Sequence, residues 1–108
     1  MTFIAGMYDN ATTRAFLSML PMTVAMSELN GREKFCKLQR ALPAASTEKP
    51  ATIEAGEIMC WSSDSLVLFY RSFANSCGGY VRLGRILDGA GLEGALGTGE
   101  VPVTFSPE

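Results

Sequence analysis

The chain has 108 residues, of which 47% are hydrophobic, so it is long enough to form one domain with a core of its own. Nine Lys and Arg against eleven Asp and Glu give a net charge of -2, which argues against nonspecific binding to nucleic acid or to acidic membrane surfaces. The absence of histidine excludes Ser-His-Asp catalysis, Cys-His catalysis and histidine–metal sites within one chain. We therefore expect a single domain over residues 1–108, with no nucleic-acid partner, no membrane partner, no metal and no cofactor.

The three cysteines, Cys36, Cys60 and Cys77, cannot all pair within the chain, and none lies in a C-x-x-C metal or redox motif. The sequence has no run of about 18 apolar residues that would span a membrane, and residues 1–6 are too short for the apolar part of a secretory signal. Reduced thiols in a cytoplasmic protein are the simplest explanation. A leader removed earlier would leave no trace in these residues.

An amphipathic helix is predicted over residues 11–20, after a strand over residues 2–8. Asn10 can cap the first backbone N–H groups of this helix, and Pro21 stops it. Three apolar side chains fall on one face of the helix: Phe16, Met19 and Leu20. This face should pack against the rest of the domain.

A β-hairpin is predicted next. Apolar and polar residues alternate over residues 22–27, which is typical of a strand with one buried face. Asn30 and Gly31 follow, and this dipeptide suits the positive φ angles of a type I′ turn. Residues 33–39 then supply the returning strand.

The second half of the chain predicts a long polar loop over residues 42–57, followed by short strands. Strands are expected at residues 57–61, 65–73, 80–87 and 101–105, with one helical turn at 92–96. Pro102 cannot donate to a β-ladder, so it should sit on an edge strand or point its missing N–H outward. About seven short strands with one main helix and a short helical turn predict a mainly β fold, an antiparallel barrel that is closed or nearly closed.

The order of short motifs along the chain resembles that of small bacterial cyclophilin-like proteins. The motifs are Tyr8-Asp9-Asn10, Phe16-Leu17-Ser18-Met19-Leu20-Pro21, Asn30-Gly31-Arg32-Glu33-Lys34, Ala55-Gly56-Glu57-Ile58-Met59-Cys60-Trp61, Leu68-Phe69-Tyr70-Arg71-Ser72-Phe73 and Arg82-Leu83-Gly84-Arg85-Ile86. The resemblance covers residues 8–105 and implies the cyclophilin-like fold, an eight-stranded barrel closed at its ends by helices. Members of that family usually begin with one more strand. The edge left by its absence is then uncovered, paired with a second copy in a homo-oligomer, or completed by preceding residues.

The resemblance also bears on function. Cyclophilin peptidyl-prolyl isomerases use a histidine-bearing, Phe-lined proline pocket and an arginine in a Phe-His-Arg segment, and no position of this chain matches that set. We therefore expect a noncatalytic barrel that binds a small molecule or a peptide. The alternatives are a peptidyl-prolyl isomerase with an atypical site built on Arg71, and a structural or interaction module.

The candidate binding residues are Phe69, Arg71, Phe73 and Trp61. Arg71 has an aromatic residue two positions away on either side, which would place all three on one face of a strand. An arginine among aromatic rings can hold a carbonyl or carboxylate by forked hydrogen bonds. Alternatively, Arg71 lays its stem over a barrel end and pairs with a nearby acid. Trp61 ends an apolar strand and either lines the rim of a pocket or plugs the barrel mouth.

Four further side chains have simpler interpretations. Cys77 lies in a glycine-rich turn and should be exposed, whereas Cys60 should be a small buried hydrophobic residue. Glu54 and Glu57 are close in sequence beside the long loop. We expect this carboxylate pair to be solvated.

Overall fold

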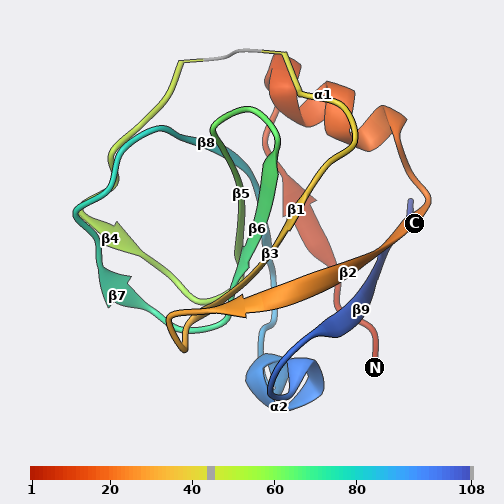
Figure 1. The fold of residues 1–108 in the computed structure, drawn as a ribbon, viewed down its shortest axis with the longest axis vertical. Helices are drawn as coiled ribbons and strands as arrows, with labels where there is room; N and C mark the ends of the chain where they lie inside the picture. Colours follow the sequence, from red (N-terminus) through yellow and green to blue (C-terminus); the bar gives the residue numbers. More distant parts are fainter. Residues whose placement is uncertain (44–45, 108) are drawn as a thin grey trace.

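The computed structural model describes residues 1–43 and 46–107 and shows a curled antiparallel sheet with a helix at each of two opposite ends (Figure 1). Within these residues the elements are β1 (Ala5–Met7), α1 (Ala11–Ser18), β2 (Met22–Leu29), β3 (Glu33–Lys37), β4 (Thr52–Ile53), β5 (Glu57–Trp61), β6 (Ser65–Phe69), β7 (Phe73–Ala74), β8 (Tyr80–Ile86), α2 (Leu92–Leu96) and β9 (Val101–Phe105). The fold is mainly β, as predicted. No helix in the described ranges is long and apolar enough to cross a membrane.

The helix α1 begins as predicted. Asn10 has an extended backbone, and its side-chain oxygen accepts a hydrogen bond from the Thr13 amide at 2.8 Å. The Asn10 amide group also donates to the Arg82 carbonyl at 2.9 Å, which ties the start of the helix to β8. Phe16 is buried in the core and the helix ends at Ser18, slightly before the predicted end at residue 20.

The predicted hairpin is confirmed by β2 and β3. Asn30 and Gly31 have φ angles of 58° and 67°, the positive values that a type I′ turn requires. Leu29 is paired with Glu33, so three residues rather than two separate the strands. The third of these residues, Arg32, follows Asn30 and Gly31 on the returning side of the turn.

The main sheet has seven strands in the order β1-β8-β5-β6-β3-β2-β9. The strands β1 and β9 are its two edges, and among the described residues they are not hydrogen-bonded to each other. The sheet is therefore a half-barrel with two unpaired edges rather than a closed barrel. Pro102 lies on the edge strand β9, as the missing N–H predicts.

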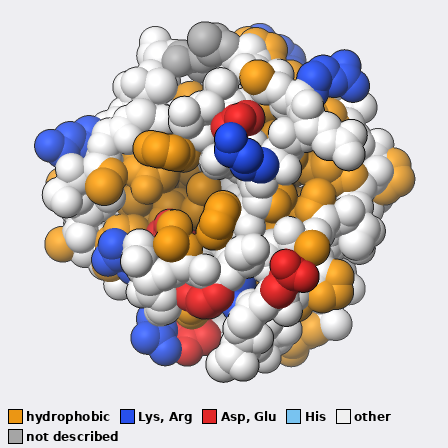
Figure 2. All heavy atoms as spheres, in the orientation of Figure 1, with side chains coloured by type: hydrophobic (Ala, Val, Ile, Leu, Met, Phe, Trp, Pro, Cys, Tyr) orange, Lys and Arg blue, Asp and Glu red, His pale blue; other side chains and the backbone are white. Residues whose placement is uncertain are grey.

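Two hydrophobic clusters lie on the two faces of this sheet. The larger cluster is enclosed by the curled sheet, and α1 contributes Phe16 to it. The smaller cluster lies on the outer face and comprises Ile53, Met59, Val67, Phe69 and Tyr80, with Phe35 and Phe73 packed against it. The two-stranded pair β4–β7 contributes to the smaller cluster. In the view of Figure 2, hydrophobic side chains gather beside β4 and β7 and also between β2, β3 and α1.

The predicted strand over residues 65–73 is wrong in its second half. The chain leaves the main sheet after Phe69, and Phe73 begins β7, which pairs with β4. Two contacts of Tyr70 hold the chain at this departure point: its amide donates to the Arg32 carbonyl at 3.0 Å, and its hydroxyl donates to Glu28. Tertiary contacts therefore interrupt a run of residues that would suit one strand.

The predicted loop over residues 42–57 contains more structure than expected. Glu48 forms an isolated antiparallel bridge with Tyr80, and β4 lies within the loop. The side chain of Asn75 donates to the Pro50 carbonyl at 2.7 Å. These bonds attach the loop to β7 and β8. Part of the predicted loop, residues 44–45, lies outside the described residues.

Candidate functional site

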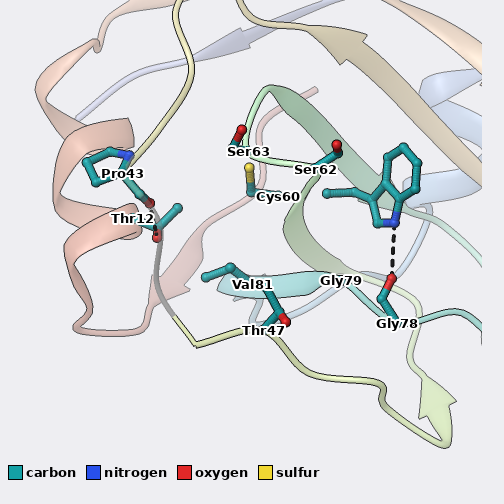
Figure 3. A pocket seen from close by; sticks show the side chains of 10 residues that line it. Thr12, Pro43, Thr47, Cys60, Ser62, Ser63, Gly78, Gly79 and Val81 are labelled. Carbon is teal, nitrogen blue, oxygen red and sulfur yellow. Dashed lines mark hydrogen bonds between the residues drawn. The ribbon is translucent and has the colours of Figure 1, made fainter.

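A pocket of about 340 Å³ opens beside Trp61, at the end of the sheet near α1 (Figure 3). We call it the Trp61 pocket. Its described lining residues come from α1, from Pro43 and Thr47, from the end of β5, from the β5–β6 turn, and from the start of β8 with the glycines before it. This volume is at the small end of the range of ligand sites in proteins.

The walls of the Trp61 pocket are neutral. Hydroxyl groups come from Thr12, Thr47, Ser62 and Ser63, and the remaining side chains are Pro43, Cys60, Trp61 and Val81. Among the residues that the structure describes, no Lys, Arg, Asp or Glu lines the pocket. Burial, reinforced by the carboxylate of Asp64, raises the pKa of the Cys60 thiol to about 11, so the thiol is uncharged at neutral pH. The pocket therefore suits an uncharged molecule.

Trp61 forms one wall and is half-exposed, with 46% of its surface accessible. Its indole Nε1 donates a hydrogen bond to the Gly78 carbonyl at 3.1 Å (Figure 3). This bond fixes the ring orientation while leaving much of the ring in contact with solvent. An indole held at a rim in this way can stack on a ligand. Cys60, the preceding residue, is buried as predicted.

The β5–β6 turn forms another wall and is conformationally strained. Ser62 and Ser63 have φ angles of 55° and 62°, a region that L-residues other than Gly, Asn and Asp rarely adopt. The Ser63 carbonyl accepts a hydrogen bond from the Leu42 amide at 2.7 Å, and the Asp64 carbonyl accepts one from Leu38 at 2.7 Å. These two bonds hold the turn against the neighbouring segment. Strained residues held by their surroundings occur often at binding sites.

The other predicted site residues lie elsewhere. Phe69 is completely buried, and its ring centroid is 5.7 Å from that of Phe73 and 6.0 Å from that of Tyr80. The arginine that contacts this group of rings is Arg32, whose guanidinium carbon lies 3.9 Å from the Phe73 ring centroid. The sequence pattern pointed to an arginine among aromatic rings, but it did not show that the additional residue of the hairpin turn would supply it.

Arg71 points away from that cluster and binds Glu93 of α2. Its Nε and Nη2 donate to the two carboxylate oxygens of Glu93 at 2.9 and 2.6 Å. This arrangement is the pairing with a nearby acid that the sequence left open. The structure thus does not bring Arg71 together with Phe69, Phe73 and Trp61, and the isomerase hypothesis gains no support from its position.

Comparison with known families identifies the fold. The sequence profile of the Cyclophilin-like family matches residues 1–106. The chain belongs to the cyclophilin-like family. No curated protein and no solved structure matches the cyclophilin-like chain. A proposal for its function therefore rests on the residues of the chain itself.

Glu54 and Glu57 of this cyclophilin-like chain differ in their exposure to solvent. Glu54 is exposed, as expected, whereas Glu57 is buried and pairs with Arg82, so the prediction of a solvated pair was wrong for Glu57. The Glu57 carboxylate also accepts a hydrogen bond from the Glu54 amide at 2.9 Å. These contacts occupy Glu57 in holding the start of β5. Cys77 is exposed, as predicted.

Proposed function

We propose that this cyclophilin-like domain is a noncatalytic binding domain whose Trp61 pocket holds a small, neutral, largely apolar molecule. The observation that supports the proposal is the half-exposed indole of Trp61 in a pocket of about 340 Å³ without a charged side chain. Apolar surface on Trp61, Val81 and Pro43 would contact the body of the ligand. The hydroxyls of Thr47, Ser62 and the neighbouring residues would bind one polar group.

Trp61 is the only tryptophan of the chain, so its fluorescence reports on this pocket alone. The test titrates the protein with benzyl alcohol and with N-acetylproline methylamide, two neutral probes, and with benzoate as the charged counterpart of the alcohol. The proposal expects a saturable change of Trp61 emission with at least one neutral probe and none with benzoate. Failure of both neutral probes, or an equal response to benzoate, would contradict it.

A pair of variants locates the binding. Thr47→Phe fills the pocket from its exposed side, and Thr52→Phe makes the same change on β4, outside the lining residues. The proposal expects Thr47→Phe to abolish the fluorescence response and Thr52→Phe to retain it. Loss of the response in both variants, or in neither, would place the binding elsewhere.

The two unpaired sheet edges favour a second candidate function, an interaction module completed by a second copy of the chain. Unpaired strand edges offer backbone N–H and C=O groups to another strand. Pro102 removes one such donor from β9, so β1 (Ala5–Met7) is the better edge for pairing. Light scattering tests this candidate: a dimer supports pairing at an edge, and a monomer at all concentrations rules it out.

A further inference from the structure

A second hollow lies between β2 and β3, and it exists because these strands pair only near their turn. The cross-strand pairs are Ser27 with Phe35, Glu28 with Lys34, and Leu29 with Glu33. Before Ser27, β2 pairs on its other side with β9, and after Phe35, β3 pairs on its other side with β6. In the described ranges, no ladder joins residues 22–26 to residues 36–41. Figure 1 shows the two strands diverging from the hairpin toward α1.

The space between the diverging strands is a groove of about 860 Å³. We call it the β2–β3 groove: residues 22–25 form one wall, residues 36–43 form the other, and Ala15, Ser18 and Met19 of α1 close its end. Residues 22–26 of β2 are hydrogen-bonded to β9, and residues 36–37 of β3 to β6, so the sides of these residues that face the groove carry backbone N–H and C=O groups that are not in a ladder. Residues 38–43 continue this wall beyond the end of β3. Five residues of an added strand would extend roughly 17 Å along this wall.

The side chains of β2 suit an added strand with one apolar face. Met22 and Val24 are half-buried and point to the inside of the sheet, whereas Thr23 and Ala25 are exposed. Met19 of α1 and Leu38 of the opposite wall add apolar surface at the inner side of the groove. Methionine adapts its shape to different partners. A strand between these walls would bury its apolar side chains inward and leave alternate side chains in solvent.

The rim of the groove is basic. Lys37 and Arg40 line it, and no Asp or Glu lines it within residues 1–43 and 46–107, although the whole chain has a net charge of -2. The Lys37 side chain is 75% exposed, and its ammonium group lies 3.5 Å from an Asp64 carboxylate oxygen. Among the described residues, Arg40 forms no ion pair. A partner with acidic residues on its solvent-facing side would therefore be attracted to this rim.

We propose that the β2–β3 groove binds an extended acidic peptide segment of a partner protein, which pairs as an additional strand between β2 and β3. Main-chain hydrogen bonds to both walls supply most of the affinity, as in other cases of strand addition. The apolar inner side selects alternate hydrophobic residues. Lys37 and Arg40 select acidic residues at the peptide positions that alternate with these hydrophobic residues.

The test uses three fluorescein-labelled, capped hexapeptides and fluorescence anisotropy. The first alternates valine with glutamate, the second alternates valine with lysine, and the third repeats the first with alternate backbone nitrogens methylated. The proposal expects saturable binding of the first peptide alone. Absence of binding by the first peptide, or equal binding of the methylated one, would overturn strand addition, and equal binding of the lysine peptide would overturn the acidic preference.

Two charge-reversal variants test where the peptide binds on the protein. Arg40→Glu changes the groove rim, and Arg85→Glu makes the same change on β8, at an exposed residue outside the groove. We expect Arg40→Glu to weaken binding of the valine–glutamate peptide by about fivefold or more and Arg85→Glu to leave it within about twofold. Equal effects of the two variants would overturn the location. A dimer of the unliganded protein that Arg40→Glu dissociates would assign the groove to a second copy and overturn the proposal for a partner peptide.

Discussion

The Trp61 pocket and the β2–β3 groove are neighbours with different chemistry. Both are lined in part by α1 and by Pro43. The pocket is closed by a hydrogen-bonded turn and has neutral walls, whereas the groove results from missing strand pairing and has a basic rim. In the two proposals, the same helix therefore borders a hollow suited to a small neutral molecule and a groove suited to an acidic peptide.

The largest expected effect concerns the end of the groove where β2 and β3 are still paired. The side chain of Lys34 is completely buried, and its ammonium group lies 3.0 Å from a Glu28 carboxylate oxygen and donates to the Gly99 carbonyl at 2.6 Å. Lys34→Met removes both contacts and leaves their acceptors without this partner. We expect the free energy of unfolding, measured in urea, to fall by about 3 kcal/mol.

Lys37→Met is the matched control, because the Lys37 side chain is mostly exposed. Its free energy of unfolding should change by less than about 1 kcal/mol. Similar losses in the two variants would mean that the buried lysine does not hold the hairpin.

The next effect separates the two sites. Trp61→Leu removes the aromatic wall of the pocket without changing a residue of the groove. Affinity for benzyl alcohol, measured by ligand-observed NMR because the fluorophore is lost, should fall by about tenfold or more. Binding of the valine–glutamate peptide should be unchanged. A parallel loss of both affinities would show that the two hollows act as one site.

Alkaline pH should lower the stability of the domain through Cys60, a residue that lines the pocket. Burial raises the pKa of this thiol to about 11, so between about pH 9 and pH 11 the unfolded chain loses the proton while the folded chain keeps it. The contribution of Cys60 to the free energy of unfolding is therefore fully present below about pH 9 and is lost as the pH rises through this range. Urea unfolding across it should show a steeper decline for the natural chain than for Cys60→Ala. Equal slopes would indicate that Cys60 ionises as easily in the folded state.

The smallest expected effect concerns the strained turn of the pocket. Ser63→Gly relieves the positive φ of 62°, and we expect a gain in the free energy of unfolding of about 0.5 kcal/mol after the greater backbone freedom of glycine is subtracted. Asn30→Gly is the control at the hairpin turn, where φ is 58° and asparagine is tolerated. It should give no gain. A loss in Ser63→Gly would mean that its hydroxyl stabilises the turn more than the strain costs.

Features that depend on adjacent residues could be predicted from the sequence. The helix cap of Asn10 and the turn at Asn30 and Gly31 require only local backbone chemistry, and both are present. Pro102 placed β9 at an edge for an equally local reason. The resemblance to cyclophilin-like proteins supplied the fold family, whereas the strand order and the two open edges of the sheet came from the structure.

Features that depend on distant residues could not be predicted in this way. Strand β6 ends at Phe69 because Tyr70 binds Arg32 and Glu28, which are about forty positions earlier. The partner of Arg71 is Glu93 for a similar reason. Trp61 was identified as a binding candidate from its position at a strand end, but its neighbours in the pocket come from four other segments of the chain.

The most direct test of two separate sites is a ¹H–¹⁵N NMR titration of one sample with both probes. Benzyl alcohol should shift the Trp61 indole and the amides of Gly78 and Gly79, and leave residues 22–26 and 36–41 unchanged. The valine–glutamate peptide, added next, should shift residues 22–26 and 36–41 while the alcohol stays bound. If both probes shift the same signals, or if the peptide displaces the alcohol, the two hollows are not separate sites and the account is wrong.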